Sequence, residues 1–421
     1  MHLIAKKCIL HPLLLREEKN SIIVIVSKKG MVIIMKNNKK KSHKVLFIVL
    51  GSIAAVIVLA ILIIPKLLFA DYQGLPTTGP YGVKQSSAIL VDAARVETFE
   101  TDGSLREVPV YFYYPDVASA SGSENGETGE FPLVIFSHGA FGYYQSNTST
   151  YMELASNGYV VISLDHPYHS FFTKDTAGKT IIVNPQFMQE VMYINEMGTP
   201  EQEIIELSHG WLDIRTADMN FVLDSMKETK ELSATAEFTE SGLPSYWHIN
   251  EISDAEEILA VLAMTDIEHI GLMGHSMGSA ASVTVGRTRD DIDAVIDLDG
   301  TMLGEQFSYI NGVYDFYDEA YPVPLLSVSN EAHYFEGQEL ADWYVNSWVL
   351  ANAKDAKYTY FKGSGHMNFT DLPLFSPALA SMLGIGDVDA EECIVKMNRL
   401  VLDYYNYYLK NMGEVTVQEG Y

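Results

Sequence analysis

Residues 270–278 read IGLMGHSMG, an apolar run that ends in a Gly-x-Ser-x-Gly pentapeptide. The apolar run is typical of a buried strand. A serine flanked by glycines at such a strand end is typical of a tight strand-to-helix turn, which pushes the hydroxyl out of the sheet while the glycines let neighbouring backbones pass closely. A helix that follows the turn points its positive N-terminus at the serine. The segment therefore predicts that Ser276 is a nucleophile at the edge of an α/β sheet.

A serine hydroxyl is a weak nucleophile, so Ser276 needs a histidine base and an acid that holds this histidine in the right tautomer. The glycine-rich loop that follows the last predicted strand contains His366. Two predicted strand ends supply an acid, and we take Asp299 as the first candidate and Glu331 as the second. Asp297, which lies within the predicted strand, is a weaker candidate.

Five short segments occur in the order that is typical of the platelet-activating-factor acetylhydrolase family. They are Phe136-Ser137-His138-Gly139, Asp165-His166, Gly274–Gly278, Leu298-Asp299 and Gly363–Phe369. The chain resembles this family and its bacterial relatives over about residues 79–410. The family places its acid soon after the nucleophile, and Asp299 lies 23 residues beyond Ser276. The chain departs from the family pattern at Ser279, where a third glycine is usual, and at Gly300-Thr301-Met302, where a bulkier aromatic pattern is usual.

Hydrolysis of an ester also needs two preorganised donors for the developing oxyanion. The N–H of Met277, directly after the nucleophile, is one candidate. Ser137-His138-Gly139-Ala140 resembles the His-Gly oxyanion loop of the family, and this resemblance implies that the Ala140 N–H is the second donor.

The remaining motifs indicate no cofactor and no metal. Five further histidines lie near predicted strand ends, where we expect them to support loops or pocket walls: His138, His166, His169, His275 and His333. His333 and Glu336 have H-x-x-E spacing, but no second matching pair and no H-E-x-x-H run accompanies them. The aromatic run from Phe307 to Tyr321 has three interpretations, namely an acyl pocket, a lid or ordinary core.

The fold class follows from strand-like and helical patterns that alternate along the chain. Eight runs predict strands: Ala88–Val91, Val108–Tyr114, Leu133–Phe136, Tyr159–Leu164, Ile270–Met273, Ala294–Leu298, Leu325–Val328 and Lys357–Phe361. Apolar residues at helical spacing predict three helices, at Glu201–Lys227, Asp254–Met264 and Ile394–Tyr408. This alternation predicts a mostly parallel sheet with helices on both faces, and the family resemblance implies the α/β-hydrolase fold.

One apolar segment precedes this domain. Val45–Ile64 holds 20 uncharged, strongly apolar positions, enough to cross a bilayer core, and lysines precede it. The positive-inside tendency predicts a single-pass signal anchor in the cell membrane, with the catalytic domain outside the cytoplasm. We therefore divide the chain into a basic cytoplasmic segment (1–44), a transmembrane signal anchor (45–66), a linker (71–80) and a catalytic domain (81–421). Residues 1–44 have no sustained periodicity, which predicts little regular structure.

Charge and cysteine content exclude some partners and bonds. Residues 1–44 hold 11 Lys and Arg against 2 Asp and Glu, and the whole chain carries −27, so the remaining residues carry −36. Such an acidic domain disfavours nucleic acids and other polyanions. The two cysteines, Cys8 and Cys393, lie on opposite sides of the predicted membrane segment, so we expect no intrachain disulfide.

These patterns predict a membrane-anchored serine esterase or lipase that uses Ser276, Asp299 and His366. The family resemblance implies short-chain or oxidised acyl esters, including phospholipid esters near the membrane surface, as substrates. Three other functions fit the same chain: an acyltransferase or a polyester-cleaving enzyme with the same triad, or a catalytically silent surface-binding protein. Labelling by a fluorophosphonate separates the silent protein from the enzymes, and product analysis with an added acceptor separates transfer from hydrolysis.

Overall fold

A computed structural model gives the fold and describes residues 22–27, 30–35, 48–50, 52, 63, 68–119, 129–234, 242–249 and 252–421. The chain divides into two units, Met1–Leu67 and Leu68–Tyr421. The predicted anchor, Val45–Ile64, lies almost wholly outside the described residues. No helix in the described part of the chain is long and apolar enough to cross a bilayer.

The first unit contains a β-hairpin that the sequence analysis did not predict. Strand β1 (Ile22–Ser27) pairs antiparallel with β2 (Gly30–Met35), and Ile22 lies opposite Met35. Both strands are rich in Ile and Val, whose branched side chains favour extended backbone. The expectation of little regular structure was therefore wrong for these residues, because a pattern of short apolar runs does not reveal strand pairing.

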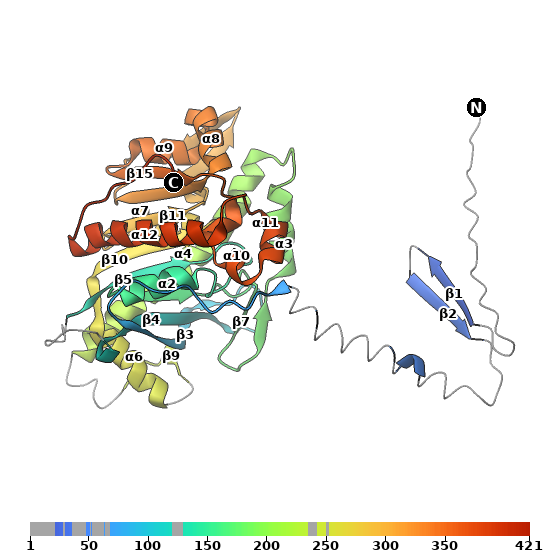
Figure 1. Cartoon of the computed structure of the whole chain (residues 1–421), viewed down its shortest axis with the longest axis horizontal. Coiled ribbons are helices and arrows are strands. Elements are labelled where there is room, and N and C mark those ends of the chain that lie inside the picture. The colour runs from blue at the N-terminus through green and yellow to red at the C-terminus, as the bar shows by residue number, and fades with distance from the viewer. Residues whose placement is uncertain are drawn as a thin grey trace. The chain divides into compact units, whose positions relative to one another are not determined.

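The second unit is built on a sheet of nine strands (Figure 1). From one edge to the other, the strands are β15 (Ala356–Phe361), β14 (Leu325–Asn330), β11 (Ala294–Leu298), β10 (Thr265–His275), β5 (Phe131–Ser137), β6 (Val160–Leu164), β4 (Leu105–Asp116), β3 (Gly82–Val96) and β9 (Trp247–His248). The six strands from β15 to β6 are parallel, whereas β4 runs antiparallel to both β6 and β3. All eight predicted strands lie in this sheet, so the prediction of a mostly parallel sheet is confirmed.

Helices cover both faces of the sheet. They are α2 (Thr148–Ser156), α3 (Pro185–Ile194), α4 (Glu201–Ser233), α6 (Ile252–Met264), α7 (Met277–Thr288), α8 (Glu331–Leu340), α9 (Val345–Asn352), α10 (Leu372–Phe375), α11 (Pro377–Leu383) and α12 (Ala390–Lys410). The three predicted helices correspond to α4, α6 and α12. Short 3₁₀ helices occur at Val117–Ser119, Leu303–Glu305, Ala341–Trp343 and His366–Phe369.

The alternation of side chains along the strands creates two apolar cores. In β5, Leu133 and Ile135 face a core that includes buried side chains of α4, α6, α7 and α9. Val134 and Phe136, the residues between and after them, face a core completed by α2 and α12. Every residue of β5 is buried, as expected for a central parallel strand with helices on both sides.

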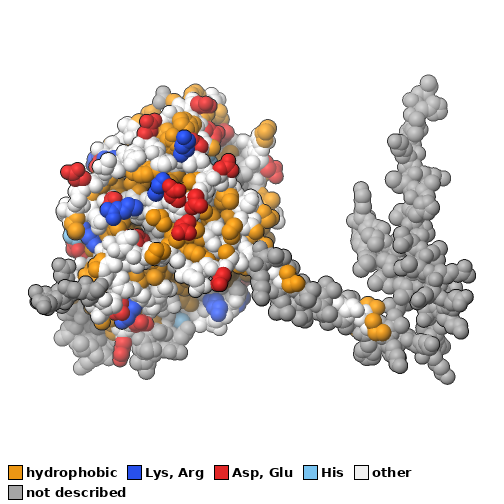
Figure 2. Space-filling model, viewed as in Figure 1, with side chains coloured by type: hydrophobic (Ala, Val, Ile, Leu, Met, Phe, Trp, Pro, Cys, Tyr) orange, Lys and Arg blue, Asp and Glu red, His pale blue; other side chains and the backbone are white. Residues whose placement is uncertain are grey.

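Two small hairpins lie outside the main sheet. Strand β7 (Phe172–Lys174) pairs with β8 (Thr180–Ile182), and β12 (Gln306–Ile310) pairs with β13 (Val313–Phe316). The β12–β13 hairpin holds part of the predicted aromatic run and meets the start of α4, where the Tyr314 hydroxyl donates to a Glu201 carboxylate oxygen at 2.7 Å. Figure 2 shows one face of the molecule, on which Asp, Glu, Lys and Arg are scattered among apolar side chains rather than gathered by sign.

Candidate active site

Ser276 lies between the C-terminal end of β10 and the first residue of α7. Its backbone has φ 55° and ψ −123°, a strained conformation for a residue with a side chain. A Cβ on Gly274 would overlap the backbone of Gly278, and a Cβ on Gly278 would overlap the carbonyl of Ser137. Only glycine fits at both positions, which is the physical reason for the Gly-x-Ser-x-Gly spacing. The turn leaves Ser276 partly exposed between two buried elements.

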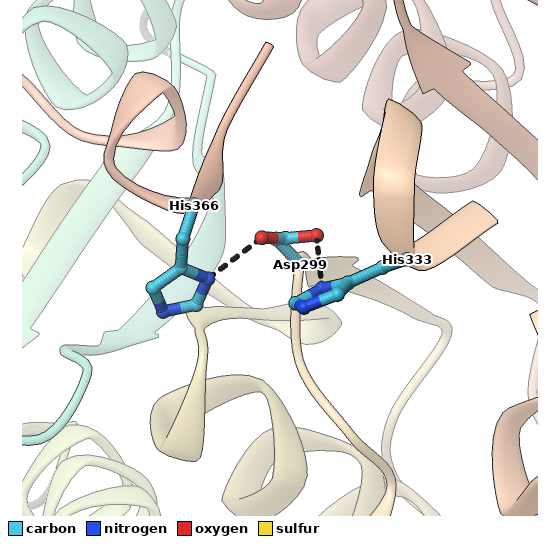
Figure 3. A group of neighbouring side chains, drawn as sticks. All are labelled: Asp299, His333 and His366. Atoms are coloured by element: carbon cyan, nitrogen blue, oxygen red, sulfur yellow. Dashed lines mark hydrogen bonds and ion pairs between the residues drawn. The ribbon is translucent and has the colours of Figure 1, made fainter. Parts of the chain in front are cut away.

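Asp299 and His366 meet beside this turn. Asp299 directly follows β11, whose last residue, Leu298, pairs with His275 and accepts a hydrogen bond from the Ser276 N–H at 3.0 Å. His366 begins the short helix after β15, and its Nδ1–H donates to Asp299 Oδ2 at 2.6 Å (Figure 3). The carbonyl of His366 lies 3.1 Å from His275 Nε2, so the histidine loop contacts the strand that ends at the serine. The structure thus brings the three predicted residues to one edge of the sheet.

The Asp299 carboxylate is buried and held by several donors. Besides His366, the backbone N–H of Asn330 donates to Oδ1 at 2.7 Å, and the Asn330 side-chain amide donates to Oδ2 at 2.8 Å. Burial by itself raises the pKa of Asp299, but hydrogen bonds and charge from His333 and His366 outweigh it and hold the pKa well below its usual range. The carboxylate is therefore anionic near neutral pH and can hold an imidazolium in place.

His333 is the site residue whose contact sequence reasoning missed. Its Nδ1–H donates to Asp299 Oδ1 at 3.1 Å, so Asp299 lies between two imidazole rings in Figure 3. This hydrogen bond raises the pKa of His333 above its ordinary value. His333 lies in the first turn of α8, where its backbone N–H donates to the Asn330 side-chain oxygen at 2.9 Å. The H-x-x-E spacing marked this histidine, but spacing alone does not reveal a contact with a residue 34 positions earlier.

One atom from each of Asp299, His333 and His366 lies within 4.8 Å of the others, a spacing at which the three residues could hold a metal ion. The hydrogen bonds between the two histidines and the carboxylate account for the same proximity without an ion. Both Nδ1 atoms carry protons in this arrangement, because a carboxylate oxygen only accepts.

The two alternative acids, Glu331 and Asp297, hydrogen-bond groups other than His366. Glu331 accepts from the backbone N–H of Gly363 at 3.0 Å, which links α8 to the loop that carries His366. Asp297 is buried and accepts from the Gly300 N–H and the Ser327 hydroxyl, each at 2.8 Å. Of the acids considered, Asp299 is the one that hydrogen-bonds His366.

The predicted oxyanion loop follows β5 and crosses the serine turn. A Cβ on Gly139 would lie 2.9 Å from His275 Nδ1 and 3.2 Å from the Cβ of Ser276, so the loop passes the turn at close range. Met277 is the first residue of α7, where backbone N–H groups have no intrahelical acceptor. Met277 and Ala140 belong to one apolar cluster with Phe187 of α3.

The other histidines that the sequence drew attention to are interior. His138, His166, His169 and His275 are all buried. Burial is the largest cause that lowers the pKa of each, to about 4 for His166 and about 3 for His275. These four imidazoles are therefore neutral near pH 7 and support loops, as their positions in the sequence suggested.

Comparison with known proteins identifies a family model and several relatives that are similar to this chain. The model of the family "Platelet-activating factor acetylhydrolase, isoform II" matches residues 113–417. Platelet-activating factor acetylhydrolase of Canis lupus familiaris is 22% identical over 313 residues, which are 71% of this chain and 62% of that protein. The corresponding protein of Gallus gallus is 23% identical over 290 residues, covering 66% of this chain and 62% of that protein.

The chain thus spans less than two thirds of the length of these relatives. Among solved structures, the ferulic acid esterase of Streptomyces cinnamoneus superposes with a TM-score of 0.57 and 20% identity, covering 82% of this chain and 95% of the esterase. This likeness supports the α/β-hydrolase fold. Because the family model covers most of the second unit, from β4 to beyond α12, the chain belongs to the platelet-activating factor acetylhydrolase, isoform II family.

Proposed function

We propose that the protein is a serine carboxylic-ester hydrolase in which Ser276, His366 and Asp299 form the catalytic triad. The single observation that carries the proposal is the hydrogen bond from His366 to Asp299 beside a serine held at positive φ. A strained serine turn persists only where the surrounding structure holds it, and such strain is typical of functional sites. Membership of the family supports the same chemistry.

The reaction proceeds in two halves. Ser276 Oγ attacks the ester carbonyl carbon while His366 Nε2 takes the hydroxyl proton, and the N–H groups of Ala140 and Met277 stabilise the oxyanion. When the tetrahedral intermediate collapses, the bond to the alcohol oxygen breaks and His366 returns the proton to the leaving alcohol. Water then attacks the acyl-enzyme with the same base, which releases the acid and restores Ser276.

The names of the relatives and the sequence support a proposal for the substrate and the location. The relatives carry the name platelet-activating factor acetylhydrolase, which supports short-chain acyl esters of phospholipids as substrates. A signal anchor over Val45–Ile64 would hold the catalytic domain at the outer surface of the cell membrane, close to such lipids.

The test is hydrolysis of p-nitrophenyl esters from acetate to palmitate by the full chain. Ser276→Ala and Asp299→Asn are each expected to lower kcat by about 10³-fold or more. Glu331→Gln is the matched control for the acid and is expected to keep activity within a few-fold of wild type.

Loss of activity in Glu331→Gln with retention in Asp299→Asn would show that the acid is misassigned. A wild-type protein that neither cleaves any ester nor reacts with a fluorophosphonate would overturn the proposed function. Hydrolysis that is strongest for acetate would place the protein among short-chain esterases, and hydrolysis that is strongest for palmitate would place it among lipases.

A further inference from the structure

Arg215 of α4 is a fully buried guanidinium beneath the predicted oxyanion loop. It donates to the carbonyl of His138 at 2.5 Å and to the carbonyl of Gly139 at 3.4 Å. Its Nε–H points to His169 Nδ1 at 3.4 Å. Within the described residues, the hydrogen bonds of Arg215 thus go to two carbonyls and an imidazole and not to a carboxylate. A buried charge without a hydrogen-bonded carboxylate is energetically costly. The contact of Arg215 with two consecutive carbonyls therefore needs an explanation.

A neighbouring charge network compensates Arg215 from one side. Asp218 lies one helical turn after Arg215 and binds Arg106 at 2.6 Å, Arg95 at 2.9 Å and His166 at 2.9 Å. The cluster, which is buried except for the partly exposed Arg95, holds three guanidinium groups and three carboxylates: Arg95, Arg106, Arg215, Asp92, Glu97 and Asp218. Burial lowers the pKa of Arg215 to about 9 despite the opposing charge of Asp218, so the side chain stays protonated at neutral pH.

The carbonyl of Gly139 has three donors around it. His138 Nδ1–H donates at 2.7 Å, the Gly142 N–H at 3.1 Å and Arg215 at 3.4 Å. A carbonyl oxygen only accepts, so His138 must carry its proton on Nδ1. Its Nε2 then accepts, and the Ser170 hydroxyl lies 2.8 Å and the His166 N–H 3.4 Å from it. The Gly139 carbonyl is thus held by three donors that are themselves buried or in the backbone.

The held carbonyl belongs to the same peptide unit as the Ala140 N–H. A trans peptide is planar, and its C=O and N–H point in opposite directions, so fixing the oxygen of Gly139 fixes the direction of the Ala140 N–H. No cis peptide occurs in the described residues. Hydrogen bonds to the carbonyl also polarise the peptide, which strengthens its N–H as a donor.

We propose that Arg215 is a positioning residue that orients and polarises the Ala140 peptide as an oxyanion donor, with His138 as its partner on the same carbonyl. The inference rests on the proposed function, because Arg215 has this role only if the Ala140 N–H stabilises an oxyanion. A donor held rigidly before the reaction needs no reorganisation as negative charge develops, and this advantage appears in the transition state.

The test compares Arg215→Met with wild type in the full chain, with active sites counted by fluorophosphonate titration. Arg215→Gln is the second variant and keeps one short donor without the charge. Both are expected to lower kcat by about 10- to 100-fold and to leave KM within about twofold of wild type, because substrate binding in the ground state does not use the oxyanion donors. Arg289→Met is the matched control, since Arg289 also contacts α4, through Asp224 at 2.7 Å, but lies at the far end of α7. It is expected to keep wild-type kcat.

A second readout separates positioning from loss of folded protein. A trifluoromethyl ketone forms a reversible tetrahedral adduct with the serine, so its inhibition constant should rise in the Arg215 variants by the same factor by which kcat/KM falls. A variant that is merely unstable loses active sites but keeps the inhibition constant of the remaining ones.

Three results would overturn the inference while leaving the proposed function intact: wild-type kcat per active site in both variants, an unchanged inhibition constant in both, or an equal loss in Arg289→Met. A wild-type protein that is inert to esters and to fluorophosphonate would instead overturn the proposed function itself. If Arg215→Met does not fold, the inference is tested with Arg215→Gln by the same two measurements, kcat per active site and the inhibition constant.

Discussion

At the scale of single residues, Asp299 is held by more groups than a triad requires. His366 and the Asn330 side-chain amide bind one carboxylate oxygen, and His333 and the Asn330 backbone N–H bind the other. Each hydrogen bond restricts rotation of the carboxylate, so it keeps one lone pair aimed at His366. This arrangement leads to a prediction for His333.

Replacing His333 with alanine is expected to lower kcat/KM at pH 8 by roughly 3- to 10-fold, since a buried carboxylate loses one hydrogen bond of about 1 kcal/mol. His333→Gln, which retains an N–H donor, should recover part of this loss, whereas His366→Ala should lower kcat by about 10³-fold or more. Steady-state kinetics of the three variants provides the measurement. A loss in His333→Ala as large as that in His366→Ala would instead make His333 the catalytic base.

Gly139 gives a second prediction at this scale, because it lies where the oxyanion loop passes the serine turn. In Gly139→Ala the new Cβ would meet His275 Nδ1 at 2.9 Å and Ser276 Cβ at 3.2 Å, so the loop must move away. We expect kcat to fall by about tenfold or more. Gly129→Ala, where a Cβ meets nothing within 4 Å, is the control and should keep activity. Equal activity in the two variants would contradict the close approach.

At the scale of secondary-structure elements, Ser279 joins the serine turn to the strand that carries the acid. Its hydroxyl donates to the Gly274 carbonyl at 2.5 Å and accepts from the Leu298 N–H at 2.9 Å. The family pattern has a glycine at this position, which has no side chain to make either bond. The hydroxyl therefore connects β10, α7 and β11 through a single side chain.

Ser279→Ala is expected to lower the free energy of unfolding by about 1–3 kcal/mol, because the buried Leu298 N–H loses its acceptor. Ser282→Ala is the matched control: within the described part of the chain, the Ser282 hydroxyl bonds only to the carbonyl four residues earlier, at 2.9 Å, and such back-bonding stabilises a helix little. Urea unfolding of both variants checks the difference. Equal stability of the two variants would show that the link between α7 and β11 contributes nothing.

At the scale of the whole molecule, buried carboxyls set the pH dependence of stability. Burial is the largest cause that raises the pKa of Asp165, Asp297 and Asp371, each to about 7 from 3.8. Between these values the folded chain keeps a proton that the unfolded chain has lost, so stability falls as pH rises through this window. Asp218 acts in the opposite direction: burial raises its pKa, but the charges and hydrogen bonds of Arg106 and His166 together outweigh burial and hold the pKa below its usual range, so its contribution is lost as pH falls. The four buried histidines, whose pKa values are lowered, also lose stability as pH falls.

Asp371 can be isolated from these opposing groups by comparison with wild type. We expect Asp371→Asn to be more stable relative to wild type at pH 8 than at pH 5, because the amide cannot ionise and can still accept from the Ser149 N–H, which lies 2.7 Å from the carboxylate. Melting curves from pH 5 to pH 8 test the prediction, and the effect corresponds to roughly 1 kcal/mol or more in the free energy of unfolding. A difference in melting temperature between Asp371→Asn and wild type that stays constant from pH 5 to pH 8 would contradict it.

The sequence by itself predicted eight of the nine strands of the main sheet and proposed Ser276 as the nucleophile. Strands, helices and the serine turn depend on patterns within about ten residues, such as the continuous apolar run of β5 and the glycines on either side of Ser276, and these patterns can be recognised in the sequence. The patterns also gave His366 and the choice of Asp299 before Glu331, the family resemblance agreed with that choice, and the structure places Asp299 and His366 together.

Only the tertiary structure decided which distant side chains touch. His333 meets Asp299 because α8 starts beside the end of β11, and Arg215 lies beneath Gly139 because α4 packs behind the loop after β5. Glu331 contacts Gly363 rather than His366 for the same kind of reason. These contacts join residues 30 or more positions apart, and their geometry depends on how helices pack on the sheet, which no local pattern of residues records.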